Sequence, residues 1–228
     1  FYEMYLDKCK RRKNFNPLVS TVFEVERVGK KGDTSTDYQF YNIKTDDSRI
    51  TPASAELLWE DHSGSVLGVT YENGVIKFMT TGVEGNAVIA AKDADGTILW
   101  SWHIWCTDQP QVQTYMNSTG NYDVLDRNLG ATRADRGEGE QWKEAVGLVY
   151  QWGRKDPFNQ QFVGYTTHYD RASVEDAIMN PNIYYGRGYS SWLNCDMNPN
   201  YWTPSQKTIY DPCPAGYLVA YNDVWRSF

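Results

Sequence analysis

The chain has 228 residues, a length that suits one large domain or two small ones. Its net charge of −7 argues against a general nucleic-acid binder. No run approaches the roughly 20 apolar residues that a membrane helix requires, which is compatible with a soluble or surface-displayed protein. Aromatic residues make up 15% of the chain, so large ring surfaces are available for a core or a binding site.

The N-terminal segment 8–13 reads KCKRRK and is almost entirely basic. Such a run is typical of a patch for nucleic acid or anionic lipid, and also of a solvated, flexible lead-in. Because the rest of the chain is acidic, we favour a lead-in that covers residues 1–16.

From about residue 20 the chain reads as short strands joined by tight turns. Residues 20–28 alternate apolar and polar positions. Asn73-Gly74 and Asp95-Gly96 each lie between two apolar runs, the strongest short signal for a hairpin. The expected strands after residue 50 are 55–60, 65–71, 75–81, 86–93 and 97–105. This spacing predicts a β-sandwich over residues 17–108.

Residues 97–105, TILWSWHIW, concentrate tryptophan in one expected strand. Alternate side chains of a strand share a face, so Trp100, Trp102 and Ile104 should enter the sandwich core. The opposite face would hold Leu99, Ser101, His103 and Trp105. We expect Trp105 to cover the junction with the region that follows. We expect His103 to be a hydrogen-bonded structural residue and not a base.

After Pro110 the chain becomes rich in turns, with one expected helix over residues 140–153. Its apolar residues recur at helical spacing: Trp142, Ala145, Val146, Val149 and Tyr150. Gly153 would end this helix, and a second helix would begin at Asn222. The fold class is therefore mainly β, with an N-terminal sandwich followed by an α+β region.

Three segments carry a resemblance to a known family. They are GNAVIAAKDADGTILWSWHIWCTD (85–108), DRNLGA with WGRKDPF (126–131 and 152–158), and TIYDPCPAGY with VW (208–217 and 224–225). Together they resemble the Bacteroidetes surface proteins that carry the Fibrobacter succinogenes major paralogous domain. The resemblance implies a secreted, usually lipid-anchored protein with an immunoglobulin-like sandwich and a C-type-lectin-like domain. Some relatives are thought to sit at fimbrial tips.

The chain departs from the family pattern in two places. The family has Arg-Val-Pro after the DPCP motif, where this chain has Leu218-Val219-Ala220. The family also continues beyond the position of Phe228, so we expect residues 109–228 to be a partial C-type-lectin-like domain, truncated at its C-terminus. An incomplete sheet would leave an open edge for a partner strand.

The family motifs place several polar residues close together in sequence. Asp126 and Asp156 suggest an acid/base pair or metal ligands. The alternative is structural, because short Asp and Asn side chains hold turns and an arginine can lock two loops together. We favour structural roles and predict no catalytic residue, metal or cofactor. The structural set is Asp126, Arg127, Asn128, Trp152, Arg154 and Asp156.

Residues 183–202, IYYGRGYSSWLNCDMNPNYW, are the best candidate for binding. Stiff aromatic rings with small polar neighbours suit sugar rings and protein epitopes. The structural alternative is that these rings cover a small domain that lacks much secondary structure. We expect at least one of the six rings below to be exposed. The predicted ligand-binding residues are Tyr184, Tyr185, Tyr189, Trp192, Tyr201 and Trp202. Cys195 and Cys213 form either one disulfide or two unrelated thiols.

The function we expect is a non-catalytic extracellular binding module at the outer-membrane surface, adhesin-like or at a fimbrial tip. Its partner would be a glycan or a host or bacterial surface protein, with no nucleic acid. Membrane attachment would come only from a lipid anchor outside this chain. The alternative is a pilus or surface-assembly subunit completed by a partner strand. An enzyme similar to the formylglycine-generating enzyme ranks last, because the cysteine pair of that enzyme has no counterpart here.

Overall fold

The computed structural model describes residues 3–5, 9–11, 22–26, 36–41, 50–159, 165–195, 200–214, 216–220 and 222–225, with side chains described from residue 50 to residue 224. The fold is mainly β, with several small and mostly antiparallel sheets and very little helix. This agrees with the predicted fold class at that level of detail.

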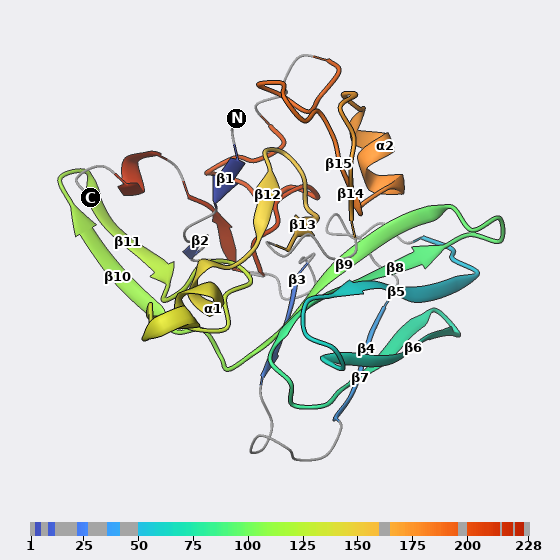
Figure 1. The fold of residues 1–228 in the computed structure, drawn as a ribbon. Coiled ribbons are helices and arrows are strands. Elements are labelled where there is room, and N and C mark those ends of the chain that lie inside the picture. The colour runs from blue at the N-terminus through green and yellow to red at the C-terminus, as the bar shows by residue number, and fades with distance from the viewer. Residues whose placement is uncertain are drawn as a thin grey trace.

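Two sheets form the lower and middle tiers of Figure 1. The four-stranded sheet has the order β3 (Val22–Glu26), β9 (Ile98–Thr107), β8 (Gly85–Lys92), β5 (Ser54–Glu60). The three-stranded sheet has the order β4 (Thr36–Tyr41), β7 (Val75–Thr80), β6 (Val66–Glu72). Both predicted hairpins are confirmed, and Asn73 at φ 52° and Gly74 at φ 81° make the turn between β6 and β7.

The core between these two sheets takes its rings from one face of β9. Trp100, Trp102 and Ile104 are fully buried, as predicted, and belong to the same cluster as Ile76 and Phe78 of β7. Leu99 departs from the prediction. It packs against this same cluster, whereas it was expected on the opposite face of the strand. The reason is a β-bulge, since the pairing of β8 with β9 shifts register at this residue.

The other face of β9 is covered as well, by the C-terminal region. Trp105 is buried with Leu125 and Leu129 in a second cluster, and its indole donates to the carbonyl of Ala131 at 3.1 Å. The predicted role of Trp105 at the junction is therefore confirmed. The middle sheet thus lies between two layers (Figure 1).

The third tier consists of short strands and turns. One sheet has the order β10 (Val112–Asn117), β11 (Gly120–Leu125), β2 (Cys9–Arg11), β16 (Tyr217–Val219). Another has the order β1 (Glu3–Tyr5), β12 (Val149–Gln151), β13 (Pro157–Phe158), and β14 (Thr166–Thr167) pairs in parallel with β15 (Ile183–Tyr184). The helical elements are η1 (Gly139–Gln141), α1 (Trp142–Val146), α2 (Val174–Met179) and η2 (Asn222–Trp225).

The N-terminal strands belong to this third tier. The backbone of β2 pairs with β11 on one side and with β16 on the other, and β1 pairs with β12. The expectation of a solvated lead-in is therefore wrong for residues 3–5 and 9–11; the rest of segment 1–16 lies outside the described residues. The domain limits 1–16, 17–108 and 109–228 stay predictions.

The expected helix over 140–153 is wrong in its second half. α1 ends at Gly147, whose φ of 78° is strained for other residues, and a Cβ there would lie 2.6 Å from the carbonyl oxygen of Leu129. The chain then turns into β12, where Tyr150 is fully buried, while Trp142 stays exposed on α1. The apolar spacing over residues 142–150, which predicted one helix, thus belongs to a short helix followed by a strand.

The helix α2 was not predicted, although Ser173 carries a local signal for it. The Ser173 hydroxyl accepts from the Asp176 amide at 3.0 Å, and the Ser173 amide donates to the Asp176 carboxylate at 3.2 Å, which forms a capping box. The helix expected at Asn222 does begin there, as the 3-10 turn η2. None of the helices in the described ranges is both long enough and apolar enough to cross a membrane.

Candidate functional site

Most of the predicted ligand-binding rings are buried or half-buried, as the structural alternative predicts, and the expectation of at least one exposed ring is met by Tyr189. Tyr185, Trp192 and Trp202 are buried, with at most 8% of their surface exposed, and Tyr184 and Tyr201 are half-buried. Each buried indole is fixed by its N–H: Trp192 donates to the carbonyl of Trp152 and Trp202 to that of Tyr210, both at 2.7 Å. A region with little regular structure uses these rings as its core, because few strand or helix faces are available there.

Tyr189 is the exception and forms part of a surface that the sequence prediction missed in part. Tyr169 and Tyr189 are exposed by 68% and 55%, respectively. The guanidinium of Arg187 lies 5.9 Å from the ring centre of Tyr169, and that of Arg171 lies 5.3 Å from the ring centre of Tyr189. We call these four residues the Tyr–Arg patch; each arginine stacks on the tyrosine of the other loop.

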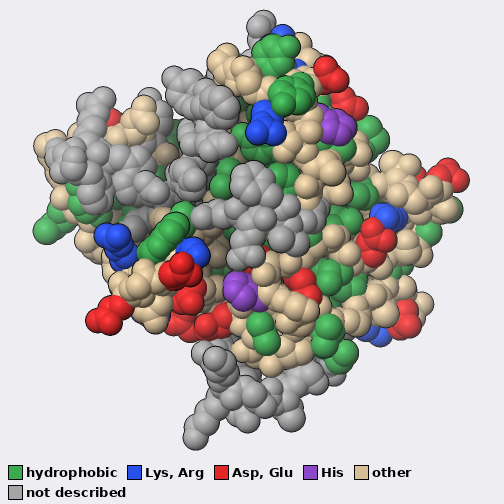
Figure 2. Space-filling view, viewed as in Figure 1, with side chains coloured by type: hydrophobic (Ala, Val, Ile, Leu, Met, Phe, Trp, Pro, Cys, Tyr) green, Lys and Arg blue, Asp and Glu red, His purple; other side chains and the backbone are tan. Residues whose placement is uncertain are grey.

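The patch lies on the tier above the middle sheet. Figure 2 shows hydrophobic, basic, acidic and histidine side chains together at the upper end of this face, over β14, β15 and α2. Two loops supply the patch: residues 168–171 follow β14, and residues 185–189 follow β15. A sequence signal existed, since each loop places an arginine two residues from a tyrosine, but nothing in the sequence indicates that the loops meet.

Main-chain hydrogen bonds hold the two loops together. The amides of Gly186 and Arg187 donate to the carbonyls of Asp170 and His168, at 2.8 and 3.1 Å. Gly186 has φ 68°, and a Cβ at this position would lie 2.6 Å from the Cα of Trp192. The close approach therefore depends on glycine, and it fixes the loop against the buried ring of Trp192.

Arg154 binds the first residue of β15. Its buried guanidinium donates to the carbonyl of Ile183 and to the side chain of Gln151, both at 2.8 Å, and it stacks on Trp192 and Phe158. Burial lowers the pKa of Arg154 to about 10, against the opposing effect of nearby Asp156. Gln151 in turn donates to the carbonyl of Tyr185 at 2.7 Å. The loop that carries the patch thus rests on a fixed polar base.

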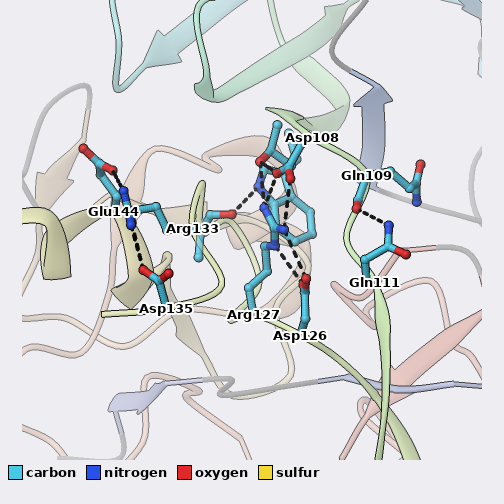
Figure 3. Close-up of polar contacts among 11 residues, drawn as sticks. Asp108, Gln109, Gln111, Asp126, Arg127, Arg133, Asp135 and Glu144 are labelled. Atoms are coloured by element: carbon cyan, nitrogen blue, oxygen red, sulfur yellow. Dashed lines mark hydrogen bonds and ion pairs between the residues drawn. The ribbon is translucent and has the colours of Figure 1, made fainter. Parts of the chain in front are cut away.

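Figure 3 shows a separate network around Arg127. Its guanidinium donates to Asp126 at 2.8 Å and to the Thr107 hydroxyl at 3.1 Å, and it pairs with Asp108. Arg127 lowers the pKa of the Asp108 carboxyl through this hydrogen bond. Asn128 donates to the carbonyl of Val146 at 3.0 Å. These contacts tie the end of β9 to the end of β11 and to α1.

Asp156 belongs to a different network from Asp126. The Ser101 hydroxyl donates to Asp156 at 2.5 Å, and the ammonium of Lys155 donates to it at 2.6 Å. All three side chains are buried between β9 and the C-terminal region. The two carboxylates that suggested an acid/base pair are therefore each engaged by their own cation.

A polar chain runs from the surface into the middle sheet. His62 lies 2.9 Å from Asp61, which accepts from the Asn86 side chain at 2.8 Å, and the Asn86 oxygen lies 2.9 Å from Nε2 of His103. The hydrogen bond to Asp61 raises the pKa of His62, whereas burial lowers the pKa of His103 to about 3. His103 is thus a neutral, hydrogen-bonded core residue, as predicted.

The predicted disulfide between Cys195 and Cys213 is wrong. Cys195 is exposed with a free thiol, and Cys106 is buried and also free, while Cys213 is disulfide-bonded. Across the ranges that are described, no group of three or more His, Cys, Asp or Glu side chains gathers in a way that suits a metal ion.

The strand β10 is the second exposed feature of the third tier. It pairs with β11 in an unbroken antiparallel register from Val112 with Leu125 to Asn117 with Gly120, and it is an edge of its sheet. Its six residues, VQTYMN, carry no charge and no proline. Met116 is 71% exposed. Natural edge strands are usually blunted by charge, proline or bulges, whereas β10 has none of these, and no further described strand pairs with it.

Comparison of the chain with protein-family models, with curated proteins and with solved structures finds no match. A function must therefore be argued from the sites themselves, which are the Tyr–Arg patch and the edge strand β10.

Proposed function

We propose that this chain is a non-catalytic binding module of a cell surface that recognises a glycan or a surface protein through the Tyr–Arg patch. The observation that carries the proposal is the crossed stacking of two exposed tyrosines with two arginines on loops fixed by main-chain hydrogen bonds. Tyrosine and arginine dominate binding surfaces because they offer large contact area with little loss of side-chain freedom.

The proposal includes a finer architecture and a location. Residues 17–108 would be an immunoglobulin-like sandwich and residues 109–228 a C-type-lectin-like domain, as the family resemblance implies. The disulfide at Cys213 supports an extracellular or outer-membrane-surface location, because disulfides persist in oxidising compartments. Attachment through a lipid anchor would lie outside this chain.

The non-catalytic part of the proposal draws on how the acidic residues are used. Asp126 is bound by Arg127, and Asp156 is bound by Lys155 and Ser101, in networks that join tiers of the fold. A general acid or base must exchange a proton with the substrate. The oxygens of these two carboxylates instead accept hydrogen bonds from structural partners.

The test is an array of glycans and surface proteins probed with the folded chain and with Tyr169→Ala and Tyr189→Ala. Each variant removes one aromatic side chain from the patch and should reduce binding by about tenfold or more. The matched control is Trp142→Ala, which removes an exposed ring from α1 and should leave binding unchanged. Equal binding by the patch variants and the control would reject the patch as the binding surface.

A second candidate function is supported by β10. We propose as the alternative that this edge accepts a strand from a partner subunit in a surface assembly, because strand addition needs a regular, uncharged edge. Met116→Lys would blunt the edge, while Asn121→Lys places the same charge on the adjacent strand β11. Light scattering at increasing concentration should show assembly lost only with Met116→Lys; a monomer at every concentration, with or without partner subunits, would reject this role.

A further inference from the structure

The two arginines of the patch differ from other arginines of the molecule in how their charge is used. Arg127 and Arg133 form ion pairs with neighbouring aspartates, and Arg154 donates to buried carbonyls. Within the described part of the chain, Arg171 and Arg187 form no ion pair, and each is held by an aromatic ring. Among the described residues, two exposed guanidinium groups therefore lie against aromatic rings and have no carboxylate partner.

The local charge of the patch is opposite to the charge of the whole chain. Asp170 is exposed between Tyr169 and Arg171 in sequence, but it forms no ion pair with either arginine in the described residues. Within the two loops, residues 168–171 and 185–189, two guanidiniums stand against one carboxylate, on a chain of net charge −7. Such a pair of guanidiniums attracts an anionic group, and the acidic remainder of the chain keeps long polyanions away.

Stacking also sets the direction in which the arginines can donate. When a guanidinium lies over an aromatic ring, one face of the guanidinium is covered. Its N–H groups point outward in its own plane and can still donate hydrogen bonds. These N–H groups match the two oxygens of a carboxylate in a bidentate pair. The tyrosine faces beside it suit the flat apolar side of a sugar ring.

The composition of the two loops favours a sugar over a protein. A stable protein interface buries about 800 Å² on each partner, with an apolar centre. Among the described residues of the two loops, the exposed large hydrophobic side chains are Tyr169 and Tyr189. Two serines, Ser190 and Ser191, follow Tyr189 in the sequence. This composition suits an oligosaccharide, which needs a few ring contacts and many hydrogen bonds.

We propose that the Tyr–Arg patch binds a carboxylated sugar, such as a uronic or sialic acid within a glycan. Arg171 and Arg187 pair with carboxylates of the ligand, while Tyr169 and Tyr189 contact its ring faces. This inference rests on the proposed binding function and adds the class of ligand.

The experiment compares matched probes by isothermal titration calorimetry. The probes are an oligogalacturonide, sialyllactose, and each of these after reduction of its carboxylates to alcohols. At least one acidic probe should bind about tenfold more tightly than its reduced form, and its affinity should fall as salt is added. The variants Arg171→Gln and Arg187→Gln should remove this preference, so that the acidic probe binds no more tightly than its reduced form. Arg136→Gln, an exposed arginine outside the patch, is the control.

The outcomes separate this inference from the proposed function. Equal affinity for acidic and reduced probes, lost with Tyr169→Ala, would overturn the carboxylate assignment and leave the binding module standing. Acidic binding that survives Arg171→Gln and Arg187→Gln would also overturn the assignment. A single-stranded oligonucleotide that binds more tightly than either acidic probe would assign the site to another class of ligand. Failure of all probes, together with array binding that is insensitive to Tyr169→Ala, would reject both proposals.

Discussion

Two aromatic regions of this molecule are held in place by different means. In β9 the rings of Trp100 and Trp102 are buried because the strand alternates its side chains between two faces, and one of those faces lies in the core between the sheets. In residues 183–202 there is little regular structure, and the buried indoles are fixed by single N–H bonds to carbonyls. A ring in a strand is positioned by the sheet, whereas a ring in a loop is positioned by its polar atom.

Each region contains one free cysteine, and the largest expected difference between the two regions is in the reactivity of these thiols. Cys106 lies in the buried part of β9, and burial raises its pKa to about 12, while Cys195 is exposed. Alkylation of the native protein should label one thiol, at Cys195. Denaturation without reduction should expose the second thiol, and reduction should bring the total to the four cysteines of the chain. Mass spectrometry counts the labels, and rapid labelling of native Cys106 would contradict the burial of β9.

The next largest effect is expected from Trp102→Ala in β9. Removing a fully buried tryptophan leaves a cavity between two sheets and should lower the free energy of unfolding by about 3–5 kcal/mol. Urea denaturation measures the change. Trp142→Ala is the matched control, because that ring is exposed, and it should stay within about 0.5 kcal/mol of the parent.

His103 makes the stability of β9 depend on pH. Its folded pKa of about 3 lies below the unfolded value of 6.5, so the unfolded chain binds a proton first as the pH falls. The contribution of His103 is thus complete above pH 6.5 and is lost below it, at about 1.4 kcal/mol per pH unit. Denaturation midpoints for the parent and for His103→Gln should converge between pH 6.5 and pH 5. Parallel curves would show that His103 is not buried as a neutral ring.

The smallest effect is expected where a single hydrogen bond positions a loop ring. Trp192→Phe keeps an aromatic side chain but leaves the carbonyl of Trp152 without its donor, at a cost of about 1–2 kcal/mol. The same substitution should weaken ligand binding, since Trp192 lies under Gly186 in the loop that carries the patch. Trp202→Phe removes the equivalent bond to Tyr210 elsewhere and should cost similar stability without changing ligand binding. Equal binding losses in both variants would point to general loosening.

The contrast also explains what sequence reasoning achieved. The strands, their hairpins and the two faces of β9 follow from local rules, because alternation and Asn-Gly turns act over a few residues. The bulge at Leu99 and the break of the expected helix at Gly147 depend on contacts with distant segments. The aromatic loop was placed on the surface by composition alone, and composition does not say which rings the rest of the chain will cover.

The candidate site shows the same limit. Tyr189 was among the predicted ligand residues, but Tyr169, Arg171 and Arg187 were not, because they join it only through parallel pairing of β14 with β15. Asp126, Arg127 and Asn128 stand where a motif predicted structural contacts, and each has such a partner. Pairing between short parallel strands has no sequence signal at this length.

The position of β2 sets an order of events during folding. Lys10 pairs with both Val124 and Leu218, so this sheet closes only when residues 9–11 and 217–219, which are far apart in the sequence, meet. Contacts of such long sequence separation form slowly, because a long loop must lose its freedom before any pairing stabilises it. The hairpins β6–β7 and β8–β9 join strands that are close in sequence, so they can form without closing a long loop. We therefore expect these two hairpins to form early, and β2 to be inserted as a late step that completes the third tier.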